Sequence, residues 1–196
     1  MEDADLDAAV ETLIDGAMFN SGQCCCGIER IYVVESLYEK FLQKAINIVE
    51  NYKLGNPLEP ETTIGPMANK RFSDEVRSQI NEAVELGATA HIKVFKNDDG
   101  GTYVTPQILT GVDHNMRIMK DETFGPVVCI MPVSSDEEAI SLMNDSEFGL
   151  TASFMVPIMV VLYLLSGLLV IFNHITEIPS LFKLFEIGRA SCRERV

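Results

Sequence analysis

Apolar residues at helical spacing open the chain and then give way to a different pattern. Between Leu6 and Ala17 they recur every three or four positions, directly after Asp5, a residue type that caps helix N-termini. Residues 28–34 are instead rich in β-branched side chains, which favour extended strands. The pattern therefore predicts a helix followed by a strand, joined by a loop at residues 20–27.

Further helices are predicted downstream. Two of them start at capping boxes, in which a Ser side chain and a Glu three residues later satisfy free backbone N–H groups. The capping boxes are Ser36 with Glu39, and Ser135 with Glu138. Another helix carries an apolar stripe and is expected to end at Gly87. The stripe comprises Phe72, Val76, Ile80 and Ala83.

Short apolar runs between these helices predict strands at residues 88–95, 103–109 and 127–133. Residues 56–66 and 96–101 are rich in Pro, Gly, Asn and acidic side chains, so we predict an exposed loop and a turn there. Because strands alternate with helices, the predicted fold class is α/β, with a largely parallel sheet flanked by helices.

The C-terminal part has a different composition. Residues 155–172 are almost wholly apolar and long enough to cross a bilayer as a helix, which adds an apolar C-terminal helix to the predicted fold. Two interpretations stay open. Either this segment anchors the protein in a membrane, or the tail is read-through from non-coding sequence, which the adapter-like residues 186–196 favour. We therefore divide the chain into a domain at residues 1–154 and a tail at 155–196.

The charge of the chain bears on its partners. The 196 residues carry a formal net charge of −14, and almost all of the acidic excess lies before residue 155. Nucleic acids are bound by clustered Lys and Arg, so we expect no DNA or RNA partner. The N-terminus lacks the basic and apolar regions of a secretory signal, and the cysteines suggest no disulfide framework, so a reducing compartment is expected.

Three adjacent cysteines, Cys24, Cys25 and Cys26, are the strongest candidates for chemistry. Consecutive side chains point in different directions and suit a single metal ion poorly, so no metal site is predicted. A loop between a helix and a strand can supply backbone N–H groups that lower a thiol pKa and hold an oxyanion. Cys25 is therefore the candidate nucleophile, and the alternative is that all three are inert buried thiols. Cys129, in an apolar run, is expected in the core.

Residues 3 to about 154 resemble the aldehyde dehydrogenase superfamily. Residues 18–26, Met-Phe-Asn-Ser-Gly-Gln-Cys-Cys-Cys, are similar to the family's cysteine signature, which implies that Cys25 is the nucleophile. Residues 120–127, Lys-Asp-Glu-Thr-Phe-Gly-Pro-Val, resemble its E-x-F-G-P-V motif. The resemblance implies that Glu122 holds the nicotinamide ribose and that Phe124 packs near the nicotinamide.

Two other segments, residues 101–106 and 144–150, also resemble the family and are expected to be architectural. The resemblance implies an oxidoreductase that converts a small-molecule aldehyde to a carboxylic acid with NAD or NADP, through a cysteine thioester. It further implies a homo-oligomeric parent protein in the cytoplasm or the mitochondrion, or at a membrane if the tail is native.

Parts of the family's machinery have no counterpart in this sequence. They are the general-base Glu of an E-L-G-G motif, an Asn that supplies an oxyanion donor, and the dinucleotide-binding domain. We therefore expect a fragment of the catalytic domain that does not oxidise aldehydes by itself. The alternatives are a membrane-anchored protein, held through residues 155–172, and a non-catalytic interaction protein that keeps the dehydrogenase fold.

Overall fold

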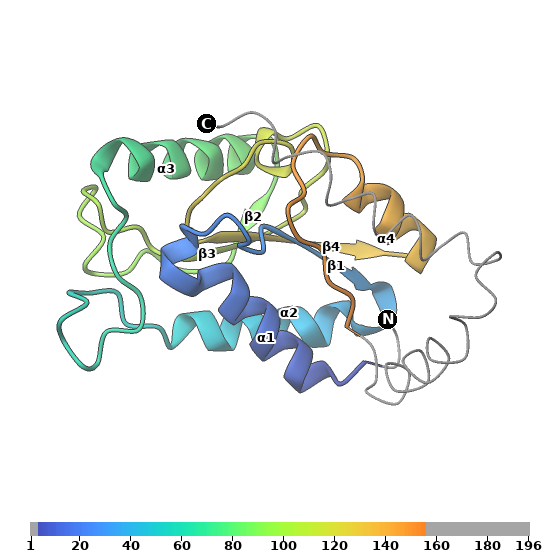
Figure 1. The fold of residues 1–196 in the computed structure, drawn as a ribbon, viewed down its shortest axis with the longest axis horizontal. Coiled ribbons are helices and arrows are strands. Elements are labelled where there is room, and N and C mark those ends of the chain that lie inside the picture. Colours follow the sequence, from blue (N-terminus) through green and yellow to red (C-terminus); the bar gives the residue numbers. More distant parts are fainter. Residues whose placement is uncertain (1–3, 156–196) are drawn as a thin grey trace, which may run out of the picture.

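The computed structural model describes residues 4–155 as a four-stranded sheet with helices on both faces (Figure 1). The helices are α1 (Leu6–Met18), α2 (Glu35–Glu50), α3 (Lys70–Glu85) and α4 (Asp136–Met143). The strands are β1 (Arg30–Val34), β2 (Thr89–Ala90), β3 (Gln107–Thr110) and β4 (Val127–Val133). Short 3-10 helices are η1 (Phe19–Gly22) and η2 (Arg117–Met119). In Figure 1, α1 and α2 cover one face of the sheet, and α3 and α4 lie on the other.

The strand order is β1-β4-β3-β2. β4 pairs in parallel with β1, where Arg30 lies opposite Cys129, and with β3, where Gln107 lies opposite Val127. β2 pairs with β3 in the antiparallel sense. The predicted α/β class is confirmed, and the sheet is mixed because β2 and β3 are consecutive strands with no helix between them, so the chain reverses direction from one to the next. β2 itself follows α3 after the turn at Gly87, whose φ is +110°.

Alternate side chains of β4 enter two separate hydrophobic cores. Val128 and Ile130 are buried in the core formed with α1 and α2, whereas Val127 and Cys129 are buried in the core formed with α3. This division follows from strand geometry, in which successive side chains point to opposite faces. The expectation that Cys129 lies in the core is confirmed.

The predicted helix starts are confirmed in two cases and wrong in one. The side chains of Asp5 and Ser135 accept hydrogen bonds from backbone N–H groups in the first turns of α1 and α4, as predicted. The capping box predicted at Ser36 is wrong, because Val34 occupies the N-cap position of α2 and no side chain caps it. β1 runs into α2 without a loop, so the pairing of the strand fixes where this helix begins.

The strands predicted at residues 88–95 and 103–109 are longer than the observed β2 and β3. Beyond the short ladder, a side chain takes over the pairing. The Gln107 Oε1 atom accepts a hydrogen bond from the Ile92 N–H at 3.0 Å, and its Nε2 atom donates to the Ile92 carbonyl at 2.6 Å. The two segments are therefore held together, but without the regular backbone pairing of a strand.

The buried face of α3 differs from the predicted stripe at its N-terminal end. Val76 and Ala83 are buried as predicted, whereas Phe72 is 49% exposed. Ser73 is fully buried in its vicinity, and its hydroxyl donates a hydrogen bond to the Gly101 carbonyl at 2.8 Å. The first turn of α3 therefore faces a polar loop rather than an apolar core.

The predicted apolar helix at residues 155–172 lies, apart from Met155, outside the described residues. Within residues 4–155, none of the helices combines the length and the apolar character that crossing a bilayer requires.

Arg77 of α3 holds the loop before β3, residues 98–103, through hydrogen bonds. Its Nη1 atom donates to the Gly101 carbonyl at 2.9 Å, and its Nη2 atom donates to the Tyr103 carbonyl at 2.7 Å and to Asp98 Oδ1 at 2.9 Å. Asp98 Oδ2 in turn accepts from the Thr105 N–H at 2.8 Å. These contacts support the expectation that residues 101–106 have an architectural role.

We expect Arg77→Ala to lower the free energy of unfolding by about 2 kcal/mol, because hydrogen bonds to charged groups contribute roughly 1.5–3 kcal/mol. Arg77→Lys should recover only part of this loss, since an ammonium group cannot reproduce the planar fork. Urea denaturation measures both, with exposed Arg71→Ala on the same helix as the control. A lysine variant as stable as the parent would contradict the assignment.

Candidate active site

The cysteine loop begins with a reversal of the chain at the end of α1. Asn20, Ser21 and Gly22 have φ values of +50°, +57° and +71°, all in the left-handed region. For residues other than glycine this region costs roughly 1–2 kcal/mol each, so other contacts have to hold the loop.

Those contacts come from the segment that precedes α3 and from within the loop itself. The Ser21 hydroxyl donates to the Gly65 carbonyl at 2.8 Å. The Gln23 Oε1 atom accepts from the Ala68 N–H at 2.7 Å, and its Nε2 atom donates to the Asn20 carbonyl at 3.1 Å. The polar residues of the cysteine signature therefore act as anchors, which place the three cysteines after a fixed turn.

The two sequence motifs meet at a contact between glycines. A Cβ atom added to Gly22 would lie 1.9 Å from the Gly125 carbonyl oxygen, and one added to Gly125 would lie 2.3 Å from Val76 Cγ2. Neither position therefore has room for a side chain. The cysteine loop and the turn that contains Glu122 and Phe124 are packed backbone to backbone.

A second contact joins the same two segments through Glu29. One oxygen of its carboxylate, Oε1, accepts hydrogen bonds from the N–H groups of Thr123 and Phe124, each at 2.9 Å. Phe124 has a φ of +52°, again in the left-handed region. Burial raises the pKa of Glu29, although the two backbone hydrogen bonds oppose this shift.

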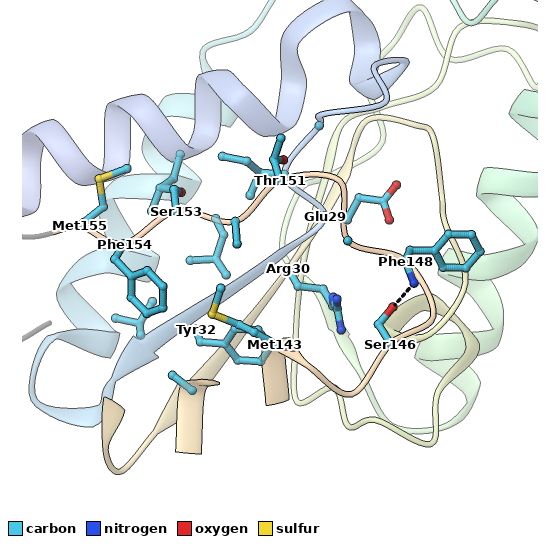
Figure 2. A pocket seen from close by; sticks show the side chains of 18 of the residues that line it. Glu29, Arg30, Tyr32, Met143, Ser146, Phe148, Thr151, Ser153, Phe154 and Met155 are labelled. Atoms are coloured by element: carbon cyan, nitrogen blue, oxygen red, sulfur yellow. Dashed lines mark hydrogen bonds between the residues drawn. The ribbon is translucent and has the colours of Figure 1, made fainter. Parts of the chain in front are cut away.

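Cys25, Glu122 and Phe124 line one cavity of about 1170 Å³. Its walls come from the cysteine loop, from β1, from the turn at residues 119–124 and from residues 146–155. Figure 2 shows Glu29 just before β1, Arg30 and Tyr32 on β1, and the segment from Ser146 to Met155 passing across the same space. The structure thus brings together every site residue that the sequence predicted.

The cysteines differ in environment. Cys25 and Cys26 are exposed and Cys24 is half-buried, so the alternative of three buried thiols is wrong. The Cys24 and Cys26 sulfurs lie 3.2 Å apart. Hydrogen bonds from the backbone and thiol of Cys26 lower the pKa of Cys24, and the same thiol pair raises the pKa of Cys26. Burial raises the pKa of Cys129 to about 12.

The sequence showed no partner for His114, which the structure places in a polar cluster beside the cavity. Its Nε2 and Nδ1 atoms lie 2.9 Å from the Tyr32 hydroxyl and from Asp145 Oδ2. Lys120 forms an ion pair with the same carboxylate at 2.6 Å and, together with His114, lowers the pKa of Asp145. The cluster ties the start of residues 144–150 to β1, which supports their architectural role.

Glu29 is the residue that sequence reasoning missed. Its partners are backbone N–H groups, which leave no pattern in the sequence, and its position just before a strand is unremarkable for an acidic residue. The only available signal was its closeness to the cysteines.

Among residues 4–155, no three His, Cys, Asp or Glu side chains form a group that could hold a metal ion.

The close contact at Gly22 predicts that adding a single methyl group there lowers the free energy of unfolding strongly. Gly100 also has a positive φ, +80°, but no atom lies within 4 Å of an added Cβ, so Gly100→Ala isolates the backbone cost of roughly 1 kcal/mol. Gly22→Ala should lower the free energy of unfolding by about 3 kcal/mol or more, because the clash with the Gly125 carbonyl adds to this backbone cost. Denaturant unfolding of the two variants gives the comparison, and equal losses would rule out the close contact.

The thiol environments predict an order of alkylation as pH rises. A thiol reacts as its thiolate, so Cys24 should react with iodoacetamide at lower pH than Cys26, and Cys129 should stay unmodified in the folded protein near neutral pH. Cys24→Ser should bring the pKa of Cys26 down toward its ordinary value. Peptide mass spectrometry across a pH series measures each rate. Equal, slow labelling of all cysteines would instead favour the non-catalytic alternative.

Comparison with known proteins agrees with this arrangement. The profile of the aldehyde dehydrogenase family matches residues 1–157. Benzaldehyde dehydrogenase YfmT of Bacillus subtilis (strain 168) is 38% identical over 153 residues, which cover 78% of this chain and 31% of that protein.

Solved structures give the same result. An aldehyde dehydrogenase variant from Bacillus cereus has a TM-score of 0.77 and 33% identity, covering 85% of this chain and 34% of its own. Betaine aldehyde dehydrogenase from Staphylococcus aureus, in complex with NAD+, has a TM-score of 0.72 and 37% identity, covering 76% of this chain and 30% of its own. The chain spans about a third of the length of the curated relatives that it matches. On this sequence and structural evidence, the chain belongs to the aldehyde dehydrogenase family.

Proposed function

We propose that this chain supplies the nucleophile and part of the cofactor contact for oxidation of an aldehyde to a carboxylic acid with NAD or NADP. One observation carries the proposal, namely that Cys25 shares a cavity with Glu122 and Phe124. A covalent nucleophile and a hydride acceptor have to meet at one carbon atom, so their binding groups belong in a common space.

Cys25 is the proposed nucleophile. Its thiolate attacks the aldehyde carbonyl carbon and forms a carbon–sulfur bond, which gives a thiohemiacetal. The carbonyl oxygen becomes an oxyanion at this step, and the backbone N–H of Cys25 is a donor for it. Loss of hydride from the same carbon leaves a thioester, and water then releases the carboxylic acid and regenerates the thiolate. NAD or NADP, when bound, accepts the hydride.

Glu122 and Phe124 fit a nicotinamide ribose and ring. The Phe124 side chain is 39% exposed and lines the cavity, so an aromatic surface is available for a flat ring. Glu122 lies two residues earlier on the same wall, where a carboxylate can accept charge-assisted hydrogen bonds from ribose hydroxyls. The NAD+ complex of the staphylococcal relative supports this choice of cofactor.

The test is Cys25→Ser in a protein that carries these residues and oxidises aldehydes. Aldehyde-dependent formation of NAD(P)H should fall by about 10³-fold or more, the scale of losing a covalent nucleophile. Cys129→Ala, which removes the core thiol, should keep most of the activity once its folded fraction is taken into account. Full activity of the Cys25→Ser variant would end the proposal.

A further inference from the structure

We propose that Glu29 is a positioning residue that holds the Thr123–Phe124 turn against the cavity and thereby sets the affinity for the nicotinamide cofactor. The inference rests on the proposed function, because it concerns the turn that carries Glu122 and Phe124.

The first argument is the geometry of the turn. Two successive backbone N–H groups converge on Glu29 Oε1, each at 2.9 Å, which is the arrangement in which a backbone nest binds an anion. The second of these groups belongs to Phe124, whose left-handed φ of +52° is unfavourable for a residue with a side chain. The carboxylate therefore stabilises the unusual backbone conformation that directs Phe124.

The second argument is the rigidity of the residue that holds the turn. The Glu29 carbonyl accepts a hydrogen bond from the Cys129 N–H at 3.0 Å, so its backbone continues the pairing of β1 with β4. Only two residues separate Glu29 from Cys26. The cysteine loop and the turn are thus both held in place relative to β1. Figure 2 shows Glu29 beside Arg30, the first residue of this strand.

The third argument is that an ionised Glu29 side chain is unfavourable in its partly buried place unless hydrogen bonds stabilise it. Glu29 is half-buried, Arg30 lies next to it, and Glu122 is a further carboxylate close enough to oppose its ionisation. A carboxylate in such a place is stabilised by the N–H groups that it accepts from. Glutamine at this position would keep an acceptor oxygen for both N–H groups without the charge, whereas leucine would fill similar space with no acceptor.

This difference defines the experiment. Glu29→Gln, Glu29→Leu and the control Glu50→Leu, which removes an exposed glutamate outside the cavity, are compared with the unmutated protein. The variants are made in the same aldehyde-oxidising protein that is used for Cys25→Ser. Hydrogen exchange of the peptide that covers residues 120–127 reports the turn, calorimetric titration with NAD+ reports the affinity, and thermal unfolding reports the global fold.

Glu29→Leu should accelerate exchange in that peptide and weaken NAD+ binding by roughly tenfold or more, the scale of leaving two backbone N–H groups without an acceptor. Glu29→Gln and Glu50→Leu should stay within a few fold of the parent. Unchanged exchange and affinity in Glu29→Leu would overturn the proposal, and so would equal losses in the glutamine variant, which would indicate a direct role for the charge.

Failure of the proposed function gives a different result. If Phe124→Ala in the same protein leaves the affinity for NAD+ unchanged, the proposed cofactor contact is refuted. Faster exchange of residues 120–127 in Glu29→Leu, at an unchanged unfolding temperature, would still identify Glu29 as the residue that positions the turn. Unchanged exchange would overturn that role too.

Discussion

The close approach of two backbones, at Gly22 and Gly125, is the constraint on which the site depends. Cys25 and Glu122 lie in distant parts of the sequence, and each belongs to a segment that would be only a surface loop by itself. The contact leaves no room for a Cβ atom on Gly22, and the Val76 side chain leaves none on Gly125. Because it is a contact between main chains, the separation of the two loops does not depend on side-chain rotamers.

The sheet supplies the frame for this contact. β1 leaves the cysteine loop and pairs with β4, which itself follows the turn at Phe124, so parallel pairing places both loops at the same edge of the sheet. Both loops precede their strands, so the site lies at the amino ends of β1 and β4 and not at the carboxyl ends, where open α/β sheets usually bind ligands. The polar anchors at Ser21 and Gln23 add a third support from the segment before α3.

Much of this could be predicted, and the failures have physical causes. Helical spacing located α1, and the resemblance located Cys25 and the turn. The predicted cap at Ser36 failed because strand pairing, a tertiary effect, decides where α2 begins. The predicted strand at residues 103–109 was too long because the side chain of Gln107 replaces backbone pairing. Glu29 could not be found, since its partners are main-chain groups that any sequence offers.

The alternation along β4 has a consequence for how this protein can vary. Val127 and Cys129 serve one core, and Val128 and Ile130 serve the other. Inserting or deleting one residue in this strand would shift its register and exchange the faces of the side chains that follow. Conservative exchanges of one apolar residue for another are therefore accessible to evolution in β4, whereas changes of length are confined to loops such as the exposed residues 56–61.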